Sequence, residues 1–177
     1  IELEGQASVE QAYVRNTAVL RTVLTDERGA SVEVLDFAPR HLKHSRIYRP
    51  IAFARVVRPL SGAPRITVRL RPSADWGARR AEQTSGSNHI RYLCTDVTLR
   101  LTTNCPVTHV QNERTFRLEG ELAFFLGPDE GYDQSVMEIV NRDSHMSYFT
   151  APVIEAAVED AGRKILQAFD TRERFFH

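Results

Sequence analysis

Ser31-Val32-Glu33-Val34-Leu35-Asp36-Phe37 is the stretch that decides the fold class. Val32 and Val34 share one face of an extended chain and Glu33 lies on the other, which is the period of a half-buried β-strand. Residues 18–24 are rich in β-branched side chains and lead into the turn sequence Asp26-Glu27-Arg28-Gly29. The two segments together predict a β-hairpin, which Pro39 closes because proline cannot donate to a ladder.

Short strands of the same kind continue along the chain. Residues 51–58 and 65–71 predict a second pair around the turn 59–64, with Ile66, Val68 and Leu70 facing inward and the intervening arginines facing water or a partner. Further strands are expected at 89–94, 97–103, 114–118 and 121–126. Roughly ten short strands at this spacing predict a mainly β domain over residues 1–130, an antiparallel two-sheet β-sandwich.

The periodicity changes after Gly127. Residues 131–149 read as a linker, in which Ser144-His145-Met146 is either an ordinary loop or the scar that a cleaved expression tag commonly leaves. In residues 150–177, apolar side chains recur at three- and four-residue steps from Ile154 to Phe169, after an early proline at 152. That pattern predicts an amphipathic C-terminal α-helix.

Composition narrows the classes of function. The chain has 23 basic and 23 acidic residues, so it lacks the field that would attract a nucleic acid. No apolar run approaches the roughly 20 residues that span a bilayer, and no signal peptide is visible, so we expect no membrane partner and a cytoplasmic protein. Cys94 and Cys105 are too few for a disulfide framework and are expected to be free thiols.

Four residues are candidates for contact with a sugar: Asp75, Trp76, His89 and Tyr92. Trp76 is the sole tryptophan, and an indole either stacks on a sugar ring or anchors packing against the core or a neighbouring domain. Asp75 beside it offers acceptors for hydroxyl groups. His89 follows Gly86-Ser87-Asn88 and is either a functional side chain or a structural histidine at the start of a strand.

No catalytic residue emerges from the sequence. Asp129 and Glu130 are adjacent, so in an extended segment they point to opposite sides and make a poor acid–base pair. The residues around Ser87 do not form a nucleophile elbow. His41 and His44 lie among basic residues with no third ligand nearby. We therefore expect no metal and no other cofactor.

Several blocks, in their order along the chain, resemble the N-terminal β-domain of bacterial glycoside hydrolase family 15, the glucoamylase- and trehalase-like proteins. The blocks are residues 13–20, residues 32–40, Asp75-Trp76-Gly77, residues 86–92 and Leu126-Gly127-Pro128-Asp129-Glu130. Ala38 replaces the family's usual methionine, and Trp76 stands where many members have tyrosine. The resemblance covers residues 1–143.

The resemblance implies a supersandwich-like β-domain followed by an (α/α)6 barrel that carries out inverting hydrolysis of α-linked glucosides. Catalytic glutamates of the family lie on the barrel, and no position here matches them. The expected function is thus a non-catalytic N-terminal β-sandwich domain that supports a missing (α/α)6 catalytic barrel, with an α-glucan or trehalose-type sugar as partner through the parent enzyme. A stand-alone carbohydrate-binding module and a structural interaction domain stay open as alternatives, as does a homo-oligomer.

Overall fold

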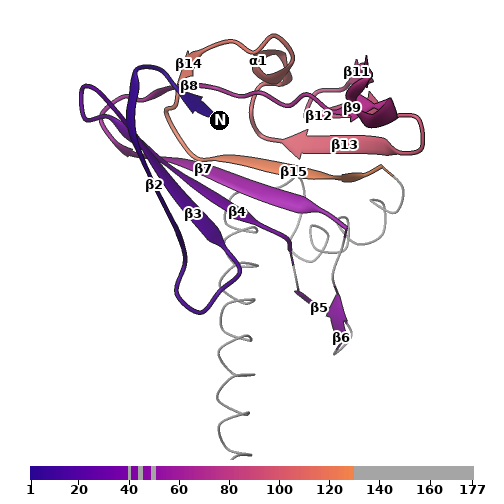
Figure 1. The fold of residues 1–177 in the computed structure, drawn as a ribbon, viewed down its shortest axis with the longest axis horizontal. Coiled ribbons are helices and arrows are strands. Elements are labelled where there is room, and N and C mark those ends of the chain that lie inside the picture. The colour runs from indigo at the N-terminus through magenta and orange to yellow at the C-terminus, as the bar shows by residue number, and fades with distance from the viewer. Residues whose placement is uncertain (40, 44–45, 49–50, 130–177) are drawn as a thin grey trace, which may run out of the picture.

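The computed structural model describes residues 1–39, 41–43, 46–48 and 51–129 (Figure 1). The expected linker at 131–149, its Ser144-His145-Met146 junction and the expected helix at 150–177 lie outside the described residues, as does Glu130. The fold class is as expected from the sequence: over the described residues the chain is mainly β with very little helix, and two main antiparallel sheets form a sandwich-like arrangement.

The larger sheet is eight-stranded and antiparallel, in the order β11-β12-β13-β15-β7-β4-β3-β2. Its strands are β2 (Gln6–Tyr13), β3 (Leu20–Asp26), β4 (Ser31–Phe37), β7 (Phe53–Ser61), β11 (Glu82–Ser85), β12 (His89–Leu93), β13 (Thr98–Thr103) and β15 (Leu122–Pro128). The smaller sheet has the order β1-β8-β14 and comprises β1 (Glu2–Leu3), β8 (Arg65–Thr67) and β14 (Phe116–Arg117). Figure 1 shows the smaller sheet lying over one face of the larger one.

Two short hairpins and two helical turns complete the described chain. β5 (His41–Lys43) pairs with β6 (Arg46–Tyr48), and β9 (Ser73–Ala74) pairs with β10 (Arg79–Arg80). The helical segments are α1 (Val107–Gln111) and the 3-10 turn η1 (Asp75–Gly77). Within the described ranges, neither is long and apolar enough to cross a membrane.

The hairpin that decided the fold class is confirmed. β3 and β4 pair antiparallel around the expected turn, and β4 spans the predicted residues. Val32 and Val34 are buried while Glu33 is only partly covered, as the alternation required. The strands expected at 89–94 and 97–103 are present as β12 and β13, and they pair antiparallel with each other.

The expected pairing of residues 51–58 with 65–71 is wrong. Both edges of β7 are already occupied, by β4 on one side and β15 on the other. The chain therefore leaves the larger sheet after β7, and β8 pairs with β1 and β14 instead. The ladder of β8 also ends at Thr67 rather than Arg71. Both edges of β15 are likewise occupied, by β13 and β7, so β14 belongs to the smaller sheet although it is close to β15 in sequence.

The main hydrophobic core lies between the two sheets. Ile66 of β8 is fully buried and sits opposite Leu3 on one side and Phe116 on the other. The larger sheet contributes Val32, Val57 and Ile90 to the same cluster. Alternate residues of the larger sheet form a second, smaller cluster on its reverse face, comprising Val19, Phe37, Ala54, Val56, Ala123 and Phe125.

The arginines of residues 65–71 meet carboxylates of the same chain. Arg65 pairs with Glu4 at 2.7 Å, Arg69 pairs with Glu2, and Arg71 pairs with Glu113 at 2.5 Å. The aliphatic side chains Ile66 and Val68 face inward as expected. These ion pairs connect the smaller sheet and its neighbouring turn around the core, although exposed pairs contribute little to stability individually.

Both cysteines are free, as expected. Cys105 is buried in the main core, and the loss of hydration raises the pKa of its thiol to about 12. A thiol in this state stays protonated at neutral pH and acts as a small apolar group rather than as a nucleophile.

Removing the side chain at the centre of the core tests this packing. Ile66→Ala should lower the free energy of unfolding by about 2–5 kcal/mol, because it leaves a cavity between the sheets. Ile66→Val should cost only about 0.5–1.5 kcal/mol. Ile51→Ala, at an exposed position, is the control and should change stability by less than about 0.5 kcal/mol in urea denaturation. Equal losses for Ile66→Ala and Ile51→Ala would contradict the arrangement.

Candidate functional site

Trp76 occupies the tip of the hairpin formed by β9 and β10. Three consecutive residues there have left-handed backbones, with φ of 53° at Asp75, 58° at Trp76 and 93° at Gly77. Such angles are easy for glycine but strained for the other two residues. Strain of this kind is retained only where the surrounding structure fixes it, and it is common at functional sites.

No residue in the part of the chain that the structure describes covers the indole of Trp76. Its exposed fraction reaches 107% of the reference value for tryptophan, so the turn holds the whole side chain away from the protein. Trp76 therefore does not pack in the described core of this chain. Two of its expected roles remain: contact with another domain and contact with a sugar ring.

Asp75 fixes the turn through hydrogen bonds to two neighbouring segments. Thr95, in the turn between β12 and β13, donates its hydroxyl to Asp75 Oδ1 at 2.7 Å. Arg79 Nε donates to Asp75 Oδ2 at 3.3 Å, and Arg79 Nη2 donates to Thr95 Oγ1 at 3.3 Å. The hydrogen bond from Thr95, followed by that from Arg79, holds the pKa of Asp75 below its ordinary value. The carboxylate thus anchors the turn that presents Trp76.

His89 serves the turn that precedes β12. The Gly86 N–H donates to the His89 carbonyl at 3.0 Å, and His89 Nδ1 lies 3.2 Å from Asn88 Oδ1. A Cβ atom at position 86 would lie 2.4 Å from the imidazole Cε1, so a larger residue there would require the ring to move. Burial, and then the charge of Arg100, lower the pKa of His89. These contacts describe a structural histidine at the start of a strand.

Tyr92 lies in the core and offers no surface to a ligand. Its exposed fraction is 1%, and desolvation raises the pKa of its phenol to about 12. The period of two explains the difference from His89: Ile90 and Tyr92 of β12 face the core, so His89 and Arg91 face the other way. The structure therefore brings Asp75 and Trp76 together with Thr95 and Arg79, and leaves His89 and Tyr92 out. The sequence does not identify Thr95 and Arg79 as part of this site, because periodicity within one segment carries no information on contacts between segments.

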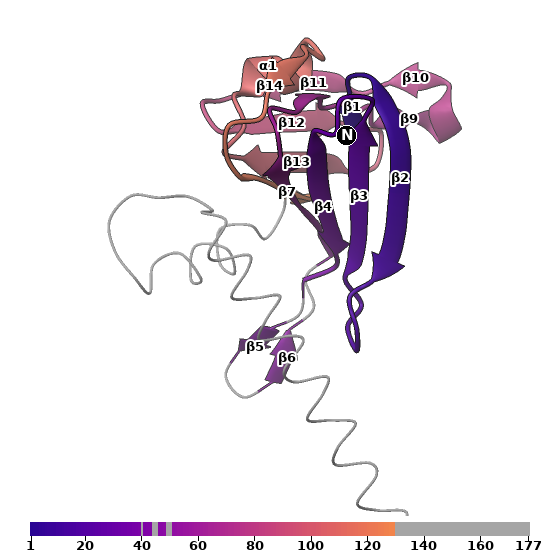
Figure 2. The same cartoon turned by 90° about the vertical axis from the view of Figure 1, so that its left-hand side faces the viewer.

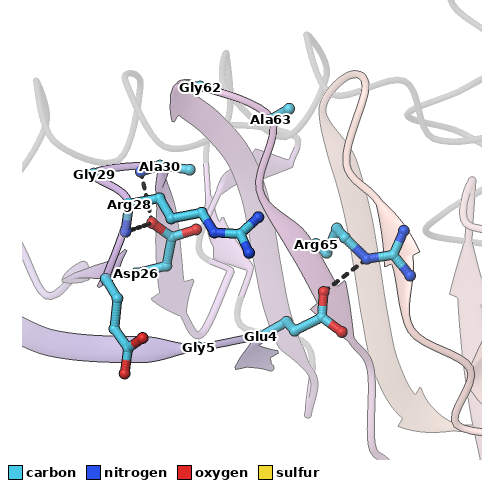
Figure 3. A pocket seen from close by; sticks show the side chains of 10 residues that line it. Glu4, Gly5, Asp26, Arg28, Gly29, Ala30, Gly62, Ala63 and Arg65 are labelled. Atoms are coloured by element: carbon cyan, nitrogen blue, oxygen red, sulfur yellow. Dashed lines mark hydrogen bonds and ion pairs between the residues drawn. The ribbon is translucent and has the colours of Figure 1, made fainter.

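A polar groove of about 420 Å³ lies at another end of the molecule, among the turns that contain Asp26 and Gly62 (Figure 3). Two of its carboxylates already have partners: Glu4 accepts from Arg65 at 2.7 Å, and Asp26 Oδ1 accepts from the backbone N–H groups of Arg28 and Ala30, each at 2.8 Å. Because these groups hold the turns in place, we assign no acid–base chemistry to the groove.

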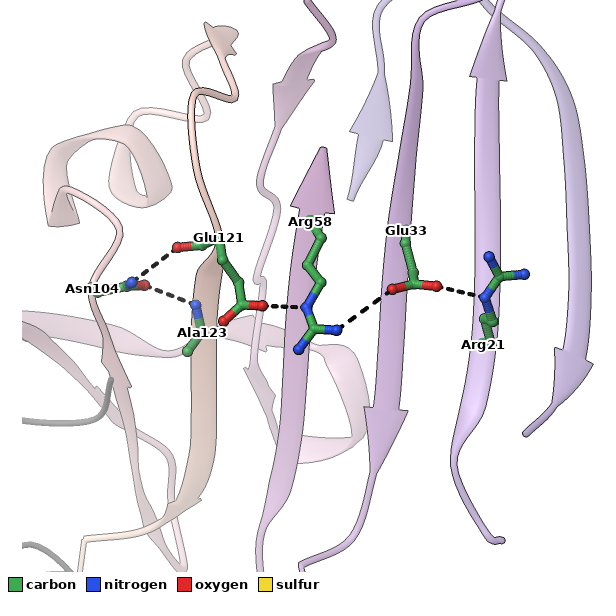
Figure 4. Close-up of polar contacts among 6 residues, drawn as sticks. All are labelled: Arg21, Glu33, Arg58, Asn104, Glu121 and Ala123. Atoms are coloured by element: carbon green, nitrogen blue, oxygen red, sulfur yellow. Dashed lines mark hydrogen bonds and ion pairs between the residues drawn. The ribbon is translucent and has the colours of Figure 1, made fainter. Parts of the chain in front are cut away.

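Alternating charges cross the reverse face of the larger sheet (Figure 4). Arg21 of β3 pairs with Glu33 of β4 at 2.5 Å, and Arg58 of β7 contacts both Glu33 and Glu121. Cross-strand pairs of opposite charge stabilise neighbouring strands by a few tenths of a kcal/mol to about 1 kcal/mol each. This row joins four segments of the sheet and leaves each of its carboxylates facing an arginine.

Asp129 is also neutralised by arginines. Its carboxylate lies 2.5 Å from Arg91 Nη2 and 3.6 Å from Arg100 Nη1. It thus links the middle of β12 and of β13 to the end of β15. Among the described residues, no group of three or more His, Cys, Asp or Glu side chains is placed to hold a metal ion.

Loss of the Thr95 hydroxyl should loosen the Trp76 turn. Because the pKa of Asp75 is lowered, the anchoring contacts are complete above its ordinary pKa of 3.8 and are lost as the pH falls through the lower, folded-state value. In Thr95→Val, the Asp75 pKa measured by NMR should rise, and the fluorescence anisotropy of Trp76 should already be low at neutral pH.

Thr84→Val is a matched control, because Thr84 is an exposed threonine on β11. It should leave both the Asp75 titration and the anisotropy unchanged. Identical anisotropy in Thr95→Val and the wild-type chain would show that the hydroxyl does not hold the turn.

Comparison with known proteins adds no relative: no family model, no curated protein and no solved structure matches the chain. The resemblance to glycoside hydrolase family 15 is carried by the sequence blocks alone and stays a prediction.

Proposed function

We propose that this chain is the non-catalytic N-terminal β-sandwich domain of a glycoside hydrolase family 15-like α-glucosidase, of glucoamylase or trehalase type, which supports an (α/α)6 catalytic barrel. The observation that carries the proposal is the fully exposed Trp76 on its anchored turn. Large aromatic side chains supply much of the binding energy at protein interfaces when a partner buries them. A cytoplasmic location and an α-glucan or trehalose-type sugar partner belong to the same proposal.

The electrostatics of the described carboxylates favour a supporting role. A general acid in glycoside hydrolysis needs a raised pKa so that it holds a proton near neutral pH. Here arginine contacts lower the pKa of Glu113, and Thr95 and Arg79 lower that of Asp75. Asp36 and Asp129 each face an arginine as well. Carboxylates in these contacts serve as structural partners, so the proposal places the chemistry on the barrel.

A carbohydrate-binding module is the second candidate, and the same turn favours it. An exposed indole offers a flat face for a sugar ring, and the neighbouring Asp75, Arg79 and Arg80 supply polar groups at its side. The two candidates differ in what covers Trp76: another protein domain in the first, a sugar in the second.

Intrinsic fluorescence separates the two candidates, because Trp76 is the sole tryptophan of the chain. Maltose, maltotriose and trehalose are titrated to millimolar concentration while emission is recorded. The supporting role predicts no saturable change for any of them. A saturable blue shift in the wild-type chain would establish the binding module instead, provided that calorimetry detects the same binding and that Trp76→Ala abolishes the calorimetric signal.

The supporting role also makes a prediction for the natural gene product. Its intact mass should be several times the 20.1 kDa of this chain, and the whole protein should hydrolyse maltose or trehalose. In that protein, Trp76→Ala should weaken domain docking by about 2–4 kcal/mol and make the two domains melt separately in calorimetry. Ile51→Ala, at another exposed apolar side chain, is the control. A product of about 20.1 kDa would contradict the supporting role.

A further inference from the structure

β2 forms one edge of the larger sheet and is exposed along its whole length. All eight of its residues are exposed, and among the described strands it pairs only with β3, on its inner side (Figure 2). The opposite edge, β11, has only four residues. Long exposed edges offer unpaired backbone groups to other strands, whereas short ones are protected by their length.

The outward backbone groups of β2 can be assigned from its pairing. The Val14 N–H donates to the Val19 carbonyl at 2.9 Å, so the backbone of residue 14 points toward β3. In an antiparallel ladder this direction alternates along the strand. The N–H and C=O groups of Val9, Gln11 and Tyr13 therefore point away from the sheet and are available to a further strand.

The side chains of these residues favour pairing. Val9 and Tyr13 lie on the same face of β2, and their exposed fractions are 56% and 69%. The strand contains no lysine and no proline, the residues that commonly block an edge, and Glu10 is its single charge. Within one chain, both apolar groups remain in water.

We propose that β2 pairs antiparallel with β2 of a second copy of this chain, about a two-fold axis at Gln11. In this register Val9 lies opposite the partner's Tyr13, and the reverse pair forms on the other side of the axis. Aromatic and β-branched side chains in such positions stabilise a sheet. The three outward-facing residues of each strand meet each other, which gives on the order of six backbone hydrogen bonds.

Neighbouring registers are worse. An axis at Glu10 would set two carboxylates directly opposite each other, which is destabilising. An axis at Val9 would place Tyr13 opposite the partner's Gly5, which lies outside β2 and has a φ of 68°. The chain also has 23 residues of each charge, so two copies do not repel at long range. The self-complementary spacing of Val9 and Tyr13 around Gln11 thus fits a second copy.

Sedimentation equilibrium of the full chain tests the proposal. The wild-type chain should show a concentration-dependent dimer. The double substitution Val9→Lys and Tyr13→Lys sets lysines opposite each other and should weaken the dimer roughly tenfold or more, a loss of about 1.4 kcal/mol or more. Both positions are exposed, so circular dichroism should stay unchanged. Gln83→Lys on the β11 edge is the matched control and should leave the dimer intact.

Cysteine crosslinking tests the register. In a Cys94→Ser background, Gln11→Cys should form a disulfide dimer on mild oxidation, because the two-fold axis brings these residues together. Glu10→Cys should form it more slowly, because Glu10 faces the partner's Ala12. A wild-type monomer at high micromolar concentration, or a dimer insensitive to the lysine substitutions, would overturn the proposal. A monomer would point instead to a strand of a different protein as the partner of β2.

Discussion

Ile66 is fully buried between the two sheets, and its burial explains how the smaller sheet is built. β7 is already paired on both edges, so the next apolar residues are buried only if the chain crosses into a second layer. There Ile66 meets Leu3 and Phe116, which draws β1 and β14 over the core. The crossing also directs residues 73–80 into the hairpin that carries Trp76.

Ion pairs between arginines and carboxylates determine which side chains of this molecule have structural partners and which features remain for binding. They fasten the smaller sheet through Arg65 and Glu4, cross the reverse face through Glu33 and Arg58, and close the end of β15 at Asp129. Exposed pairs add little stability individually, but each occupies a carboxylate with an arginine partner. Two exposed features contribute no ion pair to this network: the indole of Trp76, and the outer edge of β2 with Val9 and Tyr13. Both features suit binding to another protein surface better than they suit catalysis.

The sequence predicted what depends on local periodicity. Alternation at Val32 and Val34 located β4 and its face, and the turn at Asp26–Gly29 located the hairpin with β3. Periodicity carries no information on which strand occupies an edge, so the expected pairing of β7 with β8 was wrong. The exposure of Trp76 depends on left-handed backbone angles at two residues that are not glycine, and composition does not reveal these. Tyr92 was misplaced because its parity within β12, rather than its residue type, puts it in the core.

The proposed supporting role requires another protein domain to cover Trp76 in the natural gene product. Hydroxyl-radical footprinting measures this directly, because the oxidation rate of the peptide containing Trp76 follows the exposure of the indole and is read by mass spectrometry. Rapid oxidation in this chain and strong protection in the natural product are the predicted results. Equal oxidation rates in the two proteins would contradict the claim and show that the Trp76 turn faces solvent in both.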